Sequence, residues 1–461
     1  MLTKILKGNK NKKMNQREFL YLCARGSAME IADAVKAGAS VNRRAKFRGA
    51  SVPPLFVAVM EQNFDAIKVL FEHKTKNFPA FMAAMIMEDK KMLKYLVEVC
   101  GANINCKDQH KRTPLLCAVT ANKTKIVKWL IELGANVNVR VGLGYNVLTY
   151  AALMFDDESG EQPDAEIIKI LMAAGADYRE AMLTAIKTNN VDLAKILIQN
   201  GADINKPYTM NQSALSLAIL NIQYVRDKAL PMIKFFIENG ADVNEILDLS
   251  NDDNNEDSQP IFTTNLNVAI SMESEKCLKL LLKNGANPNF IDSKGRTPLM
   301  YAVLTGLNTV EILLNYGADP NLGDLEGRTP LTLAVIDSDV EDGVIKTLLE
   351  HGASPNIRDN SGFTPLTWAV NDRDRSSEFF VAALIRTGAV RAEKGTEWYG
   401  LAVLFNALRR EMQLENIRLL IDYGADVTIP DKKGVTALAW AFMNFDDEIA
   451  DILEKAAESK K

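Results

Sequence analysis

DSKGRTPLMYAVLTGLNTVEILLNYGADPN, residues 292–321, sets the plan on which the rest of the chain is built. It contains two short apolar patterns at helical spacing, separated by Gly306, and it ends in the pair Gly317-Ala318. Apolar residues that recur every three to four positions predict an amphipathic helix, and glycine readily takes the left-handed conformation that ends one. Such a helix pair cannot bury its apolar face alone, so it needs a similar pair on each side.

The Gly-Ala pair recurs along the chain and marks the end of successive repeats. Its last copies begin at Gly317, Gly352, Gly388 and Gly424, which are 35, 36 and 36 residues apart. We place about thirteen repeats on this basis. Their approximate bounds are 15–42, 50–77, 78–105, 108–138, 144–177, 178–205, 211–244, 262–289, 292–321, 324–356, 359–389, 395–428 and 431–461. We predict a basic, flexible tail at 1–14, one repeat domain over 15–461, and an acidic insertion loop at 245–260.

The best-formed repeats share the order D-x-x-G-x-T-P-L-x-x-A and close with G-A-D-x-N, or a near variant of it. Residues 292–321 match this order almost throughout, and it recurs at 324–356 and 359–389. In this respect the chain resembles the ankyrin-repeat family. The resemblance implies an all-α ankyrin-repeat solenoid of stacked helix-turn-helix units with short loop or β-turn fingers. It also implies protein–protein recognition without catalysis.

One departure from the family pattern affects the residue after T-P-L, which is usually His. Other residues stand there: Leu116, Met300, Thr332 and Thr367. We expect the missing histidine to remove a hydrogen-bonding anchor between loop and helix and to lower the stability of these repeats.

The composition is that of an ordinary globular protein, with 47% hydrophobic residues, 25% charged residues and a formal net charge of −5. Nucleic-acid binding requires a basic face that replaces phosphate counterions, so no nucleic-acid partner is predicted. No apolar run approaches the roughly 18–20 residues of a membrane helix, so no membrane partner is predicted either. Five unevenly placed cysteines do not make a disulfide framework. We therefore predict reduced thiols, a cytoplasmic location and a monomeric solenoid.

Neither a catalytic residue set nor a cofactor motif is recognisable in the sequence, so no enzyme activity and no cofactor are predicted. One cluster has zinc-type ligands within a short span: Cys100, Cys106, His110 and Cys117. Its members fall on a helix end, a loop and the next helix, whereas zinc needs four ligands around one point. The acidic segment 245–260 lacks the Gly and Glu positions of an EF-hand calcium loop. No metal is therefore predicted.

Two rows of equivalent residues are candidates for a binding surface. A Lys or Arg recurs on the second helices from Lys68 to Arg418; we interpret it as a solvated outer face, with a stripe for an acidic partner as the alternative. The position two residues after the Ala of L-x-x-A is apolar in seven of eleven repeats and, in the family, points into the concave groove. An exposed apolar row marks an interaction site. The predicted partner-binding residues are Met60, Ile86, Leu153, Leu220, Leu304, Ile336 and Met443.

The predicted function is a non-catalytic interaction module or scaffold that binds a protein partner through the groove and the loop tips. Local packing that covers several of the seven apolar residues is the alternative to a binding row. Two other functions stay open, an exported effector that acts on a host protein and an inhibitor or regulatory subunit of another enzyme. A hidden catalytic domain is disfavoured because no repeat departs far enough from the pattern to house one.

Overall fold

The computed structural model describes residues 14–141, 144–155, 165–209, 211–248, 262–337 and 340–371, and shorter segments between 383 and 458. The chain divides into two compact units, residues 1–203 and 204–461. We call these units the N-terminal array and the C-terminal array and describe each by itself. The sequence predicted one repeat domain over residues 15–461. The predicted tail, apart from Met14, and residues 249–261 of the acidic insertion and its flank lie outside the described residues.

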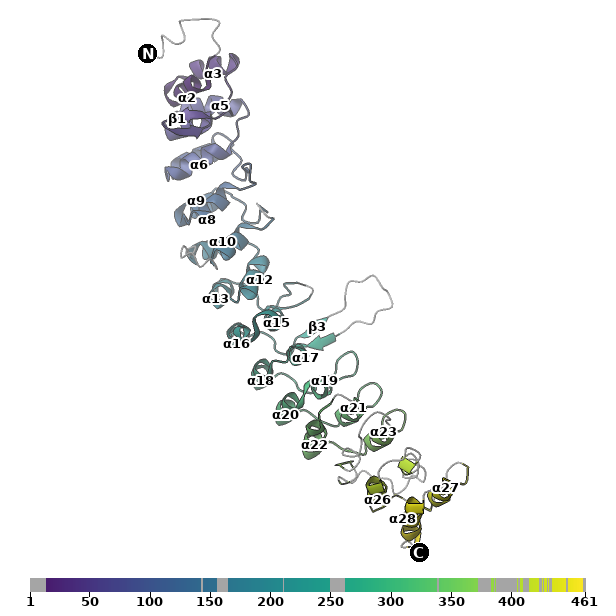
Figure 1. Ribbon diagram of the computed structural model, residues 1–461. Helices are drawn as coiled ribbons and strands as arrows, with labels where there is room; N and C mark the ends of the chain where they lie inside the picture. The colour runs from purple at the N-terminus through teal and green to yellow at the C-terminus, as the bar shows by residue number, and fades with distance from the viewer. Residues whose placement is uncertain are drawn as a thin grey trace. The chain divides into compact units, whose positions relative to one another are not determined.

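The N-terminal array consists of helix pairs that follow one another along the chain (Figure 1). The first helix of each pair contacts the first helix of the next pair. The first helices are α2 (Gln16–Arg25), α4 (Pro54–Met60), α6 (Phe78–Ile86), α8 (Pro114–Thr120), α10 (Val147–Phe155) and α12 (Arg179–Lys187). The second helices are α3 (Ala28–Lys36), α5 (Phe64–Glu72), α7 (Lys90–Glu98), α9 (Thr124–Glu132), α11 (Ala165–Ala173) and α13 (Val191–Gln199).

The C-terminal array repeats this arrangement, and its successive first helices from α14 to α23 are in contact. The first helices are α14 (Ala214–Leu220), α17 (Asn265–Ser271), α19 (Pro298–Thr305), α21 (Pro330–Ile336), α23 (Pro365–Asn371) and α27 (Ala437–Met443). The second helices are α16 (Leu230–Glu238), α18 (Glu275–Lys283), α20 (Leu307–Asn315), α22 (Asp342–Glu350), α26 (Leu414–Asp422) and α28 (Asp447–Glu458). Between α14 and α16 lie a short helix α15 (Ile222–Val225) and a 3-10 turn η1 (Arg226–Ala229).

The only strands in the described residues form two antiparallel hairpins. One pairs β1 (Ala45–Phe47) with β2 (Ala50–Val52), and its turn has positive φ at Arg48 and Gly49, as two-residue hairpins of type I′ require. The other pairs β3 (Ile246–Asp248) with β4 (Phe262–Thr264). Residues 246–248, which the sequence placed in a loop, are thus a strand. Both hairpins lie between a second helix and the next first helix.

Helix starts follow the Thr-Pro signal in the sequence. Thr113 accepts a hydrogen bond from the backbone N of Leu116 at 3.2 Å, and Pro114 takes the first helical position, where no N–H is needed. Leu115 and Ala118 of this L-x-x-A motif are almost completely buried. The small Ala allows close approach of the neighbouring helices. No helix in the described part of the chain is long and apolar enough to cross a membrane.

Asparagine side chains join each repeat to the next and form a ladder. In the C-terminal array Asn289 donates from Nδ2 to the carbonyl of Gly317 at 3.0 Å and accepts from the backbone N of Asp319 at 2.7 Å. In the N-terminal array Asn138 makes the same two bonds to the repeat that follows it, at 2.9 and 2.7 Å. The ladder satisfies backbone groups at the ends of second helices that would otherwise lack partners. Further members are Asn205, Asn244 and Asn321.

Candidate functional site

The seven apolar residues predicted to bind a partner lie at or near the ends of first helices. On α19, Leu299 and Ala302 are fully buried, whereas Leu304, two residues further along, is 50% exposed. Three other members are exposed to a similar degree, namely Ile86 at 60%, Leu153 at 42% and Met443 at 57%. The remaining members, Met60, Leu220 and Ile336, are half-buried. Four of the seven side chains are thus open to solvent, and packing partly covers three.

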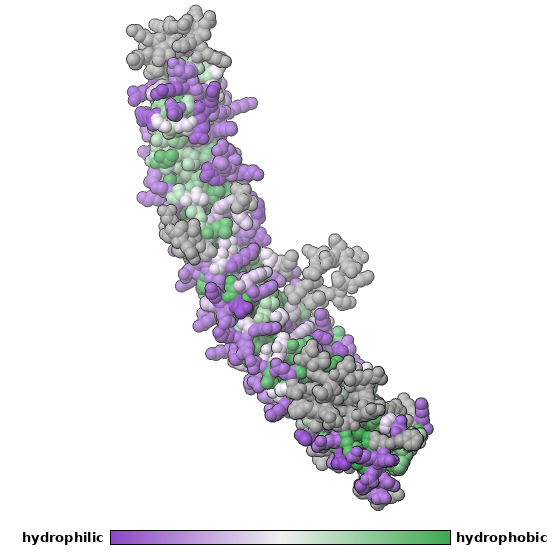
Figure 2. Space-filling view, in the orientation of Figure 1, coloured by the Kyte–Doolittle hydropathy of each residue, from purple (hydrophilic) through white to green (hydrophobic). Residues whose placement is uncertain are grey.

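The first helices around these residues carry almost no charge. None of α4, α6, α8 and α10 in the N-terminal array contains Asp, Glu, Lys or Arg. The same holds for α14, α17, α19, α21, α23 and α27 in the C-terminal array. Figure 2 shows a largely apolar area at the level of α6, with hydrophilic side chains beside it. Because charged residues are absent from these helices, an exposed apolar side chain on them has no charged neighbour on its own helix.

The fingers are the segments between the second helix of one repeat and the first helix of the next. In several fingers an Asp side chain accepts hydrogen bonds from the backbone of its own finger and so fixes the turn. Asp324 accepts from the backbone N of Glu326 and of Arg328, at 3.1 and 2.8 Å, and its other oxygen accepts from Arg328 Nε at 2.9 Å. Asp108, Asp292 and Asp359 hold their own turns in the same way. These turns place the finger backbone beside the start of each first helix.

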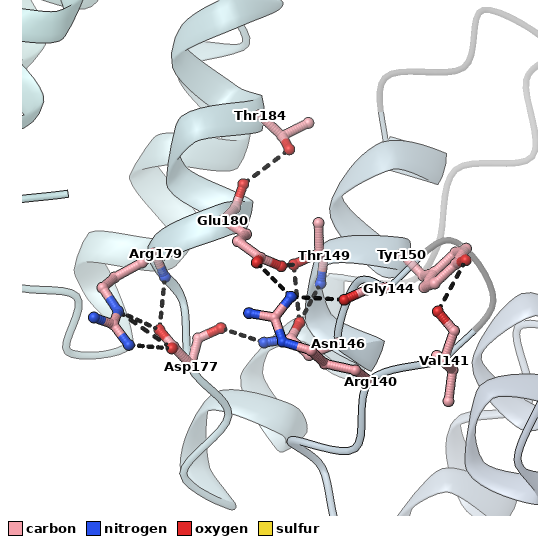
Figure 3. A network of polar contacts seen from close by, with 10 residues as sticks. All are labelled: Arg140, Val141, Gly144, Asn146, Thr149, Tyr150, Asp177, Arg179, Glu180 and Thr184. Atoms are coloured by element: carbon pink, nitrogen blue, oxygen red, sulfur yellow. Dashed lines mark hydrogen bonds and ion pairs between the residues drawn. The ribbon is translucent and has the colours of Figure 1, made fainter. Parts of the chain in front are cut away.

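A polar network in the N-terminal array explains how a repeat without the usual His is held (Figure 3). Thr149 stands at the His position, and its hydroxyl donates to Asn146 Oδ1 at 2.9 Å. Asn146 Nδ2 donates to the carbonyl of Asp177 in the next repeat at 2.7 Å. Glu180 then accepts from Arg140, whose Nη1 lies 2.9 Å from Oε1. A hydroxyl and an amide therefore replace the imidazole and connect neighbouring repeats.

The predicted loss of an anchor at the His position is only partly right. Thr332 pairs its hydroxyl with that of Thr329 at 3.0 Å, and Thr367 does the same with Thr364. At Met300 the anchor is a weak one, in which Met300 Sδ accepts from the backbone N of Thr297 at 3.4 Å. There the buried hydroxyl of Thr297 has no hydrogen-bond partner among the described residues. Where the replacement is Thr, its hydroxyl thus supplies an anchor in place of the imidazole.

Two finger carboxylates in the N-terminal array are held in their charged form. Hydrogen bonds from Arg179 lower the pKa of Asp177 below its usual range. Burial alone would raise the pKa of Asp108, but hydrogen bonds from Arg112 and from the backbone N of His110 outweigh it and leave that pKa lowered. Both carboxylates therefore stabilise the fold as anions.

Cysteines and histidines in the described residues do not assemble into a chemical site. No group of three or more His, Cys, Asp or Glu lies close enough there to hold a metal ion. Burial raises the pKa of Cys23, Cys106 and Cys277 to about 12, so these thiols stay protonated and are poor nucleophiles. His351 Nδ1 lies 2.9 Å from the carbonyl of Thr347, one turn back on its own helix.

The lysines that recur on second helices are exposed, and several of them pair with an acid of their own helix. Lys94 lies 3.6 Å from Glu98 and is 61% exposed, and Lys279 lies 3.6 Å from Glu275. Surface pairs of this kind contribute little to stability, so these residues form a solvated outer face.

The charge of the fingers is a feature that was not predicted from the sequence, because the net charge of the whole chain concealed it. Counting Lys, Arg, Asp and Glu finger by finger would have revealed it from the sequence.

Comparisons with known proteins agree with this architecture. The family model "Ankyrin repeats (3 copies)" matches residues 80–178, 153–247, 245–324 and 316–389. An ankyrin repeat protein of Acanthamoeba polyphaga mimivirus is 35% identical over 117 residues, which is 23% of this chain and 35% of that protein. The ankyrin repeat domain-containing protein M-T5 of myxoma virus is 24% identical over 237 residues, 48% of this chain and 44% of that protein. The nuclear factor NF-kappa-B p105 subunit of Gallus gallus is 29% identical over 141 residues, 28% and 14% of the two chains.

The alignments span less than half the length of each of these relatives. The predicted count of about thirteen repeats is overstated, because the family model covers only residues 80–389. Eleven complete helix pairs lie within the described residues, from α2–α3 to α27–α28. The repeats themselves are established by the helix pairs, the ladder and a family model that covers more than half of the sequence. The chain belongs to the ankyrin-repeat family.

Proposed function

We propose that the protein binds a partner protein along its first helices and the fingers that lead into them, and that it carries out no catalysis itself. Ankyrin repeats are protein–protein interaction modules. The observation that supports the location is the exposure of Ile86, Leu153, Leu304 and Met443 on helices without charged residues. The partner-binding set proposed from the sequence also includes Met60, Leu220 and Ile336, whose exposed parts would add to the contact.

Energetics support this surface. Fully burying one large aliphatic side chain is worth about 1.5–3 kcal/mol. A few such anchors therefore offset a large part of the entropy that association costs, provided that the receptor is already ordered. The asparagine ladder and the Asp-based turns supply that order, because they fix each repeat to the next before any partner arrives.

The alternatives concern what the partner is. An exported effector would bind a host protein, and an inhibitor or regulatory subunit would cover another enzyme's active site. The mimivirus and myxoma virus origins of two relatives are compatible with a host partner. Our proposal includes a monomer in a reducing, cytosolic compartment, in line with five cysteines that are all free thiols. It also includes a protein ligand rather than nucleic acid or membrane.

Aspartate substitutions on and off the surface test the proposal. The tagged full chain and the variants Ile86→Asp and Leu304→Asp would be used to capture proteins from cytosolic extract. The controls are Val99→Asp and Tyr316→Asp, which change side chains that are 62% and 43% exposed at the ends of second helices. We expect the first pair to lose partners that the controls retain, with unchanged circular dichroism. Unaltered capture by Ile86→Asp and Leu304→Asp, or loss of their helical signal, would reject the surface.

A further inference from the structure

The fingers of the N-terminal array carry an excess of positive charge. Four of its fingers, 37–53, 73–77, 100–113 and 134–146, contain ten Lys and Arg residues and one acid, Asp108, and the short finger 174–178 adds one more acid, Asp177. All ten basic side chains are exposed. They are Arg43, Arg44, Lys46, Arg48, Lys74, Lys76, Lys107, Lys111, Arg112 and Arg140. We call this set the basic finger edge.

Most of this charge is not neutralised by the protein itself. Three members form ion pairs: Arg48 with Glu61 at 2.7 Å, Arg112 with Asp108 at 2.8 Å, and Arg140 with Glu180 at 2.9 Å. The other seven have no carboxylate partner among the described residues. Two of these seven donate to carbonyl groups, Arg44 to Ser51 and Lys107 to Arg140. Such bonds fix the side chain but leave its full positive charge available.

Hydrogen bonds hold successive fingers next to one another. Asn42 Oδ1 accepts from the backbone N of Lys76 at 2.9 Å, which joins the first finger to the second. Lys107 Nζ lies 3.0 Å from the carbonyl of Arg140, which joins the third finger to the fourth. Each finger leads directly into a first helix that has no charged residue. The basic finger edge therefore lies at the starts of α6 and α10, and Ile86 and Leu153 lie at or near the other ends of these two helices.

The corresponding fingers of the C-terminal array have the opposite balance. Segments 239–248, 285–297, 317–329 and 352–364 contain eight acids and four basic residues. Arg328, one of the four, is held by both Asp324 and Glu326 at 2.8 Å. Positive charge is thus a property of one array and not of the repeat pattern.

We propose that the basic finger edge and the uncharged first helices beside it bind an acidic segment of the partner protein, one that carries apolar side chains as well as carboxylates. This inference rests on the proposed function and specifies its partner. The apolar side chains would cover Ile86 and Leu153 while the carboxylates pair with the finger lysines and arginines. Charge complementarity of this kind raises the association rate and excludes partners of the wrong sign.

A protein segment fits this surface better than a nucleic acid. Single-stranded nucleic acids stack their bases on exposed aromatic rings. Of the two aromatic residues in these fingers, Phe47 is only 8% exposed, so a single exposed ring remains, that of Tyr145 at 38%, and it packs edge-on against Tyr150 with ring centres 6.1 Å apart. The uncharged helices offer nothing to a phosphate, whereas they suit leucine-like side chains.

A charge-reversal variant with a matched control tests the proposal on the full chain. The edge variant combines Lys46→Glu, Lys74→Glu, Lys76→Glu and Lys111→Glu. The control combines Lys68→Glu, Lys94→Glu, Lys128→Glu and Lys169→Glu, which change exposed lysines on second helices of the same array. The probe is a labelled peptide of four Glu-Leu-Leu-Glu blocks, and anisotropy gives its Kd at low and at physiological salt. A peptide of Glu-Ser-Ser-Glu blocks and a thymidine oligonucleotide of equal charge are the competitors.

We expect the edge variant to weaken peptide binding at least tenfold and the control less than threefold, with a smaller salt dependence in the edge variant. The Ser peptide should bind more weakly than the Leu peptide. Equal losses in the two variants, no measurable peptide binding at low salt, or an oligonucleotide that binds as tightly as the Leu peptide would overturn the proposal. Ile86→Asp is measured alongside. If it abolishes binding while the edge variant binds normally, the apolar surface stands and the acidic partner is rejected.

Discussion

The N-terminal and C-terminal arrays are built on one backbone plan but treat finger charge differently. Arg328 in the C-terminal array is bound on both sides by carboxylates of its own finger. In the N-terminal array Lys46, Lys74 and Lys111 are exposed and have no carboxylate partner among the described residues. Hydrogen bonds join successive fingers in both arrays, from Lys76 N to Asn42 in the N-terminal array and from Asn360 N to the carbonyl of Glu326 at 2.8 Å in the C-terminal array.

The difference shows that scaffold and recognition are carried by different residues of the repeat. Leu and Ala of L-x-x-A, the capping Thr and the ladder Asn recur in both arrays, and they determine how repeats stack. Exposed finger positions contact little of the core, so their charge can change without loss of fold. One array can therefore present a charged edge while the other neutralises Arg328 within its own finger.

The largest difference that we expect between the arrays is in the loss of stability when the Asp at the centre of a finger is replaced. Asp324→Ala removes the acceptor of two backbone N–H groups and of the Arg328 guanidinium, and the Asp324 side chain is 0% exposed. We expect a loss of about 3 kcal/mol, because a buried ion pair loses one partner. Asp108→Ala in the N-terminal array should cost about 1–2 kcal/mol, since its partner Arg112 is 50% exposed. Hydrogen exchange of the amides in each finger measures both, because a repeat array can open locally. Equal losses of amide protection in the two variants would contradict the expected difference between the arrays.

The asparagine ladder should instead behave alike in the two arrays. Asn289→Ala and Asn138→Ala each remove two bonds of nearly the same length to the following repeat. We expect each to lower the free energy of unfolding by about 1–2 kcal/mol. Urea unfolding followed by circular dichroism gives the two values, with Asn315→Ala at the exposed end of α20 as control for loss of an Asn. A difference of more than about 1 kcal/mol between the ladder variants would show that the arrays differ in more than charge.

Lowering the pH should produce the smallest change in the free energy of unfolding, and this change arises in the N-terminal array. The folded-state pKa values of Asp108 and Asp177 lie below their usual range. Their stabilising contribution is therefore complete above about pH 4, the unfolded pKa, and is lost as pH falls through the lower folded pKa. Asp177 is 39% exposed, so solvent reduces its share. Titration of the unfolding free energy from pH 6 to about pH 2.5 should show a smaller drop for Asp108→Asn than for the wild-type chain. Parallel curves would contradict the lowered pKa of Asp108.

Much of the fold could be predicted because its determinants are local. Residues 292–321 contain the helical periodicity, the Thr-Pro start and the closing Gly, and the structure has α19 and α20 there. The same reasoning identified Ile86, Leu153 and Leu304 as surface candidates, since their distance from the buried Ala fixes the helix face they occupy. Whether a partner binds them is a property of that partner, so it remains a prediction.

Other features depend on contacts between distant residues and were not predictable from local patterns. Strands β1 and β3 have three residues each, too few for an alternating pattern to be recognised. The replacement of His by other residues looked like a lost anchor, whereas at Thr149 the acceptors that compensate come from Asn146 and from the next repeat. The charge of the basic finger edge disappeared in a whole-chain total of −5.

The ladder also gives the chain a direction during synthesis. Each ladder Asn belongs to the earlier repeat, and it bonds to the Gly carbonyl and to a backbone N–H of the later one, as Asn244 does with Gly285 and Asn287. A chain made on the ribosome folds from its N-terminus. When a new repeat leaves the ribosome, the ladder Asn of the preceding repeat has already been synthesised. If that preceding repeat has folded, its Asn side chain is already in position to bond to the new repeat. The seams between repeats can therefore form in the order in which the residues are translated, without waiting for the C-terminus.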